Sequence, residues 1–191
     1  MTSGKQQYKI PRLNPFFLNV VDWVEVLIFS LSFVILLFTF IARLAVVDGP
    51  SMEKTLIEGE MLIVSDLGYT PKNNDVIVFQ SPTSYFKEPI VKRVIAKAGQ
   101  TVDIDFRTWT VSVDGEKLDE SYVNFEGGYM YNPGYLDYPY TVPDGMLFCM
   151  GDNRNHSSDS RSREIGPVDE RFVLGKVIFR LTPLSKIGAV K

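Results

Sequence analysis

Ser51 and Lys92 are the two residues of this chain whose types and surroundings best suit a hydrolytic reaction. A serine hydroxyl is a poor nucleophile unless a base accepts its proton, and the only histidine, His156, offers little scope for a histidine relay. A lysine can act as that base once burial among apolar groups lowers its pKa from about 10.4 to about 7–8. Four apolar neighbours in sequence are expected to bury Lys92: Ile90, Val91, Val94 and Ile95.

Length and charge limit the classes of protein to which the chain can belong. Its 191 residues are enough for one globular domain and an appendage. Residues 1–21 carry Lys5, Lys9 and Arg12 and no acid, whereas residues 47–191 contain 16 basic and 21 acidic side chains. The downstream part therefore lacks the excess of basic residues that is typical of nucleic-acid binding, and no nucleic-acid partner is expected. The single cysteine, Cys149, cannot form a disulfide within the chain and does not decide the compartment.

The appendage is an apolar segment near the N-terminus. Residues 26–42 contain no formal charge, and apolar side chains occupy every face of the helix that they would form. A helix of about 20 residues spans a bilayer, so we expect a transmembrane helix over residues 23–46. A buried core helix and a cleaved signal peptide are the alternatives, but no A-x-A cleavage site follows the run. The basic N-terminus predicts a cytoplasmic segment 1–22 and an extracytoplasmic domain 47–191, in a single-pass protein of the cell membrane.

The downstream domain is expected to be mainly β. Seven runs rich in β-branched or aromatic residues predict strands, at 61–65, 75–79, 90–96, 101–104, 110–113, 146–150 and 176–181. Turn-forming residues separate them, and Asp114-Gly115 is typical of a two-residue hairpin. This spacing favours an antiparallel β-sheet domain. Residues 125–140, rich in Tyr, Gly and Pro, are expected to form an irregular connection or a surface flap.

Four sequence boxes resemble, in order, those of type I signal peptidases. They are Gly49–Leu56 (GPSMEKTL), Asp75–Phe79 (DVIVF), Val91–Ile95 (VKRVI) and Gly151–Arg161 (GDNRNHSSDSR). The resemblance implies a compact membrane-bound endopeptidase with one N-terminal anchor. Such an enzyme removes signal peptides from exported preproteins, at the surface of a lipid bilayer and without a metal ion or other cofactor.

The resemblance also implies roles for individual residues. Ser51 matches the acyl-forming nucleophile and Lys92 the general base, and Ser157 matches the serine that orients the lysine amine. Five charged residues match supporting positions of the family: Arg93, Asp152, Arg154, Asp159 and Arg161. Asp159 is expected to form an ion pair, for which Arg161 and the nearby Arg163 compete.

Two departures from the family pattern affect the turn that carries Ser51. Lys54 stands where the family usually has proline, which puts the rigidity of this turn in doubt. Gly49 stands where some members supply a hydroxyl for the oxyanion, so the oxyanion hole would depend on backbone N–H groups.

Further matches imply two shallow pockets that admit alanine-sized side chains one and three residues before the cut. Substrate would bind by strand addition. Besides Gly49, the matching residues are Val47, Asp48, Met52, Leu56, Leu62, Ile90 and Val91.

Two other classes of protein stay open at this level. One is a catalytically silent, membrane-anchored assembly or chaperone module for exported subunits, which would not need both Ser51 and Lys92. The other is a self-cleaving serine/lysine regulator, which should carry a DNA-binding domain in place of a membrane helix. The sequence does not distinguish a general enzyme from one dedicated to a few substrates.

Overall fold

A computed structural model of the chain describes residues 15–40, 42–80, 87–125 and 127–190. The chain divides into two units, residues 1–39 and residues 40–191. The first unit is formed by the helix α1 (Pro15–Phe40), which contains an 18-residue stretch, Asn19–Leu36, long and apolar enough to cross a membrane. The basic residues used to predict the orientation, Lys5, Lys9 and Arg12, lie outside the described residues.

Both boundaries predicted for the helix are wrong. We expected a helix over residues 23–46, but α1 begins at Pro15 and ends at Phe40. Arg43–Val46 form the strand β1, which pairs antiparallel with β2 (Met61–Ser65). The periodicity of a short apolar run does not by itself distinguish a helix from a strand. Hydrogen bonding to β2 decides the conformation of these four residues.

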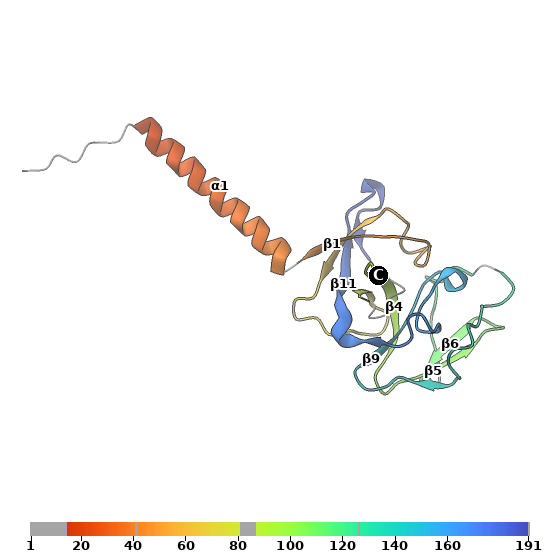
Figure 1. The fold of residues 1–191 in the computed structure, drawn as a ribbon. Coiled ribbons are helices and arrows are strands. Elements are labelled where there is room, and N and C mark those ends of the chain that lie inside the picture. Colours follow the sequence, from red (N-terminus) through yellow and green to blue (C-terminus); the bar gives the residue numbers. More distant parts are fainter. Residues whose placement is uncertain (1–14, 41, 81–86, 126, 191) are drawn as a thin grey trace, which may run out of the picture. The chain divides into compact units, whose positions relative to one another are not determined.

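The second unit contains two antiparallel sheets (Figure 1). The large sheet has the strand order β1-β2-β11-β3-β4-β9-β10, and β12 also pairs with β11. Its remaining strands are β3 (Val76–Phe79), β4 (Ile90–Lys97), β9 (Met146–Met150), β10 (Val168–Asp169), β11 (Val173–Arg180) and β12 (Gly188–Ala189). The antiparallel β prediction for this unit is thereby confirmed.

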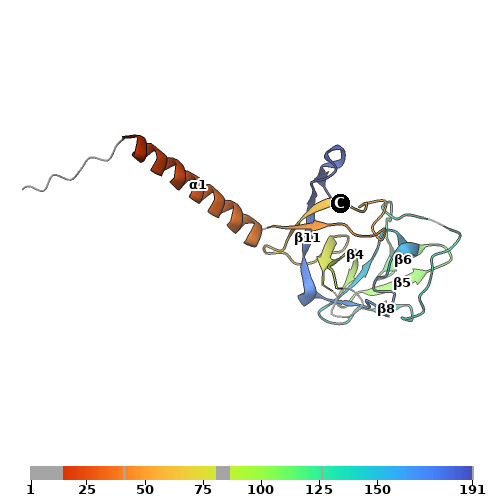
Figure 2. The same ribbon diagram turned by 45° about the horizontal axis from the view of Figure 1, so that its top comes forward.

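The small sheet has the order β7-β6-β5-β8. Its strands are β5 (Thr101–Asp105), β6 (Thr110–Val113), β7 (Glu116–Lys117) and β8 (Tyr140–Thr141). Asp114 and Gly115 connect β6 to β7, both with positive φ, as a two-residue hairpin of the primed type requires. In both views β5 and β6 lie on the opposite side of β4 from β11 (Figures 1 and 2).

Short 3-10 turns complete the second unit, at Arg154–His156, Glu170–Phe172 and Leu184–Lys186. The first of them lies within the Gly151–Arg161 box, which follows β9 directly.

The core consists of three apolar clusters, which meet the central strands from different directions. One joins Phe148 and Met150 of β9 to the small sheet. A second packs Met52 and Leu56 against β2, β3 and β11. A third fills the space around β3, β4 and β9. Residues 92–96 of β4 are all buried, so that two of the three basic side chains of this strand, Lys92 and Arg93, lie in the interior.

Candidate active site

Ser51 lies in a tight turn that follows β1. The Pro50 carbonyl accepts a hydrogen bond from the Glu53 N–H, and the Met52 carbonyl accepts bonds from two later N–H groups. Asn153 stabilises this turn with two hydrogen bonds. Its backbone N–H donates to the Ser51 carbonyl at 3.0 Å, and its Nδ2 donates to the Pro50 carbonyl at 3.2 Å. The Gly151–Arg161 box thus holds the turn that presents the Ser51 hydroxyl.

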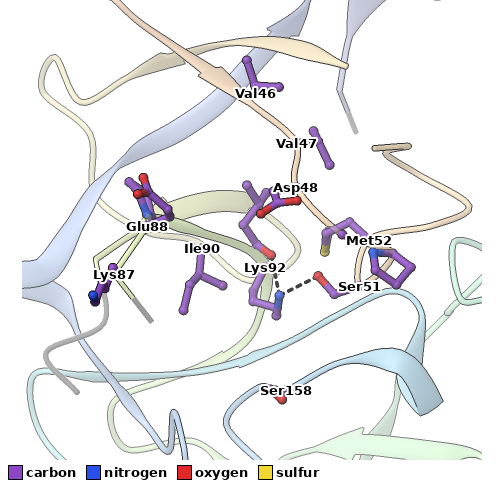
Figure 3. Close-up of a pocket in the computed structure, with 14 residues that line it drawn as sticks. Val46, Val47, Asp48, Ser51, Met52, Lys87, Glu88, Ile90, Lys92 and Ser158 are labelled. Atoms are coloured by element: carbon purple, nitrogen blue, oxygen red, sulfur yellow. Dashed lines mark hydrogen bonds between the residues drawn. The ribbon is translucent and has the colours of Figure 1, made fainter. Parts of the chain in front are cut away.

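Lys92 reaches the same hydroxyl from β4. Its Nζ lies 2.7 Å from Ser51 Oγ and 2.9 Å from the Val91 carbonyl oxygen (Figure 3). Lys92 is only 3% exposed. Loss of hydration lowers the pKa of its amine to about 8, although the carboxylates of Asp159 and Asp152 act in the opposite direction. A substantial fraction of the amine is therefore neutral near pH 8 and able to accept the serine proton.

Arg93 points to the opposite face of β4, where it forms a buried ion pair with Asp152. Its Nε and Nη2 donate to the two oxygens of the carboxylate at 2.8 and 2.7 Å, and both side chains are almost completely buried. The Tyr122 ring lies 4.0 Å from the guanidinium carbon, and Thr55 donates its hydroxyl to Asp152. This pair links β4, the Gly151–Arg161 box and the end of the turn that carries Ser51.

Asp159 pairs with Arg161, which answers the question that the sequence left open. Arg161 Nε and Nη2 each donate to the carboxylate at 2.8 Å, whereas Arg163 is exposed. Burial alone would raise the pKa of Asp159, but the Arg161 charge and the hydrogen bonds from Arg161, the Gly151 N–H and Ser157 outweigh it and lower that pKa. Asp159 therefore stays ionised.

The expectation for Ser157 is wrong in this structure. Its hydroxyl donates to Asp159 Oδ2 at 2.8 Å, and among the described residues it makes no hydrogen bond with the Lys92 amine. A buried carboxylate is a stronger acceptor than an amine, and it lies only two residues away. The Val91 carbonyl and Ser51 orient the lysine instead.

Arg154 finds a partner that the sequence did not suggest. Its guanidinium pairs with Glu120, which is buried, and burial raises the pKa of this acid. Glu120 and Tyr122 belong to a segment, residues 120–124, that touches the box again where the Asn124 N–H donates to the Asp152 carbonyl at 3.0 Å. No charge pattern in the sequence marks this segment, and only its packing against the box gives it a role.

Gly49 and Lys54 both show how the turn differs from the family pattern. Gly49 has φ of 77°, and the backbone N–H of Ser51 has no hydrogen-bond partner within the described part of the chain. Lys54 has φ of 61°, a value that proline cannot adopt. Its amine donates to the Ser121 carbonyl at 2.9 Å and to the Val123 carbonyl at 3.4 Å. Hydrogen bonds from a lysine thus hold the turn where proline would stiffen it.

Gly151, the first residue of the Gly151–Arg161 box, has a role that the sequence did not predict. A Cβ at this position would lie 2.5 Å from the Ser51 carbonyl oxygen and 2.3 Å from Ser157 Oγ. Backbone atoms cannot move aside as a flexible side chain does. Glycine is therefore required for the box to approach the Ser51 turn this closely.

A cavity of about 330 Å³ opens in front of Ser51 and Lys92. Six residues expected at the substrate cleft line it: Val47, Asp48, Gly49, Met52, Ile90 and Val91. The expectation is wrong for Leu56 and Leu62, which are fully buried in the core cluster beneath Met52 and do not line the cavity. Alternation along β2 turns Leu62 into this core. Besides Ser51 and Lys92, residues not anticipated for the cleft complete the lining: Val46, Pro50, Lys87, Glu88, Pro89 and Ser158.

A serine hydroxyl hydrogen-bonded to a buried lysine amine, beside the central strand β4, makes the chain a candidate for the class of hydrolases. Comparisons with known proteins narrow this class. The sequence model of the family "Signal peptidase, peptidase S26" matches residues 20–182. A probable signal peptidase I-1 of Synechocystis is 33% identical over 174 residues, which cover 86% of this chain and 84% of that protein. Signal peptidase IB of Staphylococcus aureus is 32% identical over 185 residues, with 88% and 92% covered.

The chain is also similar to a solved structure. A crystal structure of a signal peptidase I from Enterococcus faecalis is 32% identical in sequence and matches 57% of this chain and 97% of that chain, with a TM-score of 0.46.

The chain belongs to the signal peptidase family, peptidase S26, and is a serine endopeptidase of the type I signal peptidases. Membership of this family and the apolar helix α1 together make it a membrane-anchored enzyme that removes signal peptides.

Proposed function

We propose that Ser51 is the nucleophile and Lys92 the general base with which this endopeptidase cuts exported preproteins after an Ala-x-Ala sequence. The observation that carries the proposal is a buried amine, with a pKa lowered to about 8, at 2.7 Å from a serine hydroxyl. Geometry and protonation state thus meet the two requirements of a general base.

The contacts of Lys92 fit each proton transfer of such a reaction. A neutral amine has two N–H groups and one lone pair, so it can donate to the Val91 carbonyl while it accepts the Ser51 proton. As that proton moves to Lys92, Ser51 Oγ forms a bond to the carbonyl carbon of the substrate. The C–N bond then breaks, and Lys92 returns the proton to the leaving amine. A water attacks the resulting ester with Lys92 again as the base, which frees Ser51.

Charge on the substrate oxygen needs donors during both attacks. The unpartnered N–H of Ser51 is suited to this role, and Gly49, which has no Cβ, permits the close approach of the substrate. Removing one such donor typically lowers kcat by about 10²–10³-fold. In this proposal the Arg93–Asp152 and Asp159–Arg161 pairs support the reaction indirectly, because they hold the box that fastens the Ser51 turn.

The free edge of β4 suits binding by strand addition. Ile90, Val91 and Lys92 pair with β3 on one side, while β9 pairs with β4 only from Arg93 onward. Within the described residues, the other edge of 90–92 therefore has no strand partner. A substrate strand lying there would place alternate side chains in the cavity lined by Val47, Met52 and Ile90. A cavity of about 330 Å³ has to hold the peptide backbone as well, which favours alanine-sized side chains.

The experiment is cleavage of a purified preprotein by the detergent-solubilised chain, with the new N-terminus determined by mass spectrometry. Wild type should cut after Ala-x-Ala, and Ser51→Ala should not cut. Ser112→Ala, on the small sheet, is the matched control and should retain wild-type activity. Processing at the same bond by Ser51→Ala would overturn the assignment of the nucleophile.

The orientation in the membrane is part of the same proposal. Basic residues before α1 and an acidic domain after it favour a cytoplasmic N-terminus and an extracytoplasmic peptidase domain in the cell membrane. Protease added to intact spheroplasts should digest the domain and leave a small protected N-terminal fragment. Full protection of the domain until the membrane is permeabilised would contradict this orientation.

A further inference from the structure

A second and larger cavity, of about 720 Å³, lies next to the candidate active site. Its lining includes Tyr131 and Tyr135, Ser158 and Arg161 of the Gly151–Arg161 box, and Arg163 and Glu164 just after the box. Neither the reaction nor the binding of the residues before the cut, as argued above, uses this cavity.

The two cavities adjoin at Ser158, which lines both of them. In Figure 3 Ser158 lies on the opposite side of the Ser51–Lys92 pair from Val46 and Val47. A peptide whose scissile bond is at Ser51, and whose preceding residues lie against Val47, continues past Ser51 in the other direction. Its following residues therefore run toward Ser158 and the second cavity.

The walls of this cavity are fixed by specific contacts. Asn155 Oδ1 accepts a hydrogen bond from the Tyr131 N–H at 2.8 Å, and Asn155 Nδ2 donates to the Tyr129 carbonyl at 3.2 Å. The Tyr135 ring lies against Gly166, where an added Cβ would be 3.5 Å away. Asn155 itself belongs to the box, so the same segment that supports Ser51 also sets the width of the cavity.

The charges of the cavity differ from those of the surrounding domain, which is acidic. Arg161 is neutralised by its buried partner Asp159, although its Nη1 has no hydrogen-bond acceptor among the described residues. Arg163 is exposed and makes no hydrogen bond or ion pair in the described part of the chain. The pKa of Glu164 is lowered by hydrogen bonds from its own backbone and from Ser162 and by the Arg163 charge, so this acid is ionised beside it. Arg163 is the charge here that a ligand can pair with.

We propose that the second cavity binds the residues that follow the cut, and that Arg163 gives it a preference for Asp or Glu over Lys at these positions. This assignment rests on the proposed function, because it requires a peptide that is cut at Ser51. An exposed ion pair contributes little, so the preference is expected to be about two- to fivefold at low salt.

The test uses peptides that are identical up to the cut and carry Asp, Ala or Lys at one of the first three positions after it. For wild type, kcat/KM should be highest with Asp and lowest with Lys, at one position at least. Arg163→Ala should remove this difference and Arg163→Glu should invert it, while Glu164→Gln should enlarge it. Lys117→Ala changes an exposed cation on the small sheet and should leave the wild-type preference intact.

High salt should reduce the preference of wild type for Asp, because it screens exposed charges. Equal kcat/KM for the three peptides, or a preference that Arg163→Ala retains, would overturn the assignment of the cavity and leave the proposed function standing. Failure of wild type to cut any of the peptides would overturn the proposed function, and this assignment with it.

Discussion

Lys92 and Arg93 are consecutive on β4 and both are buried, yet they face opposite sides of the strand and have different bonding partners there. Lys92 faces apolar side chains, a serine hydroxyl and a carbonyl, and no carboxylate among the described residues bonds to it. Arg93 faces Asp152, which accepts two hydrogen bonds from it. Burial without a bonded counter-ion lowers the pKa of Lys92, as its proposed role as a base requires. Burial beside a bonded carboxylate keeps Arg93 charged and fixed in place.

The strongest test of this comparison changes Lys92 itself. Lys92→Ala should lower kcat by at least about 10³-fold, because the proposed base and the proposed nucleophile would act as a unit. Lys92→Arg should lower kcat by a similar factor, since a guanidinium stays charged and cannot accept the proton. The double variant Ser51→Ala/Lys92→Ala should be little worse than either single variant. Additive losses in single-turnover kinetics would show that the two residues act separately.

On the opposite face of β4, removing one partner of the Arg93–Asp152 pair should destabilise the fold far more than replacing both partners. Asp152→Ala removes the carboxylate that accepts two hydrogen bonds from the buried Arg93 guanidinium, and it should lower the free energy of unfolding by about 3–5 kcal/mol. The apolar pair Arg93→Met/Asp152→Leu should recover much of that loss. Chemical denaturation of the three proteins checks this prediction.

The matched control for this pair is an exposed one. Asp66→Asn removes the partner of Arg43, and the expected change is within about 0.5 kcal/mol. A loss for Asp152→Ala no larger than that of the control would mean that water reaches the Arg93 charge.

Lys92→Met should have the opposite effect on stability. The unfolded chain holds the lysine proton up to a pKa of about 10.4, whereas the folded chain releases it near 8, so the wild type gains stability as the pH rises between these values. Below pH 8 the wild type bears the full cost of burying the charge. The methionine variant should therefore be more stable there by roughly 3 kcal/mol, and the gain should vanish by about pH 10.4. Thermal unfolding at several pH values measures it. A gain that does not depend on pH would point to packing as its cause.

The smallest expected effect concerns the apolar face around Lys92. The acidic limb of kcat/KM should lie near pH 8, because in the proposed mechanism the neutral amine is the active form, and its fraction falls about tenfold per pH unit below the pKa. Met52→Gln should admit water, ease the charging of the amine and move this limb to higher pH. Met52→Leu keeps the face apolar and is the control. A limb near pH 10 in the wild type would identify Lys92 as an ordinary solvated lysine.

Local patterns in the sequence predicted the fold of the second unit well. Runs such as 61–65 and 146–150 became strands with those bounds, and Asp114-Gly115 became the expected turn. These features depend on alternation and on φ preferences, which neighbouring residues decide. The helix prediction was wrong for residues 43–46 because their conformation depends on a partner strand.

The sequence by itself also determined which residues could react, since the types and order of its boxes single out Ser51 and Lys92. Only the tertiary structure decided that Ser157 bonds to Asp159, that Glu120 pairs with Arg154 and that Leu56 and Leu62 lie beneath the cleft. Each of these outcomes is a choice among several chemically suitable partners or faces. Close packing brings one of them within hydrogen-bonding or contact distance, and that distance is not encoded in any short stretch of the chain.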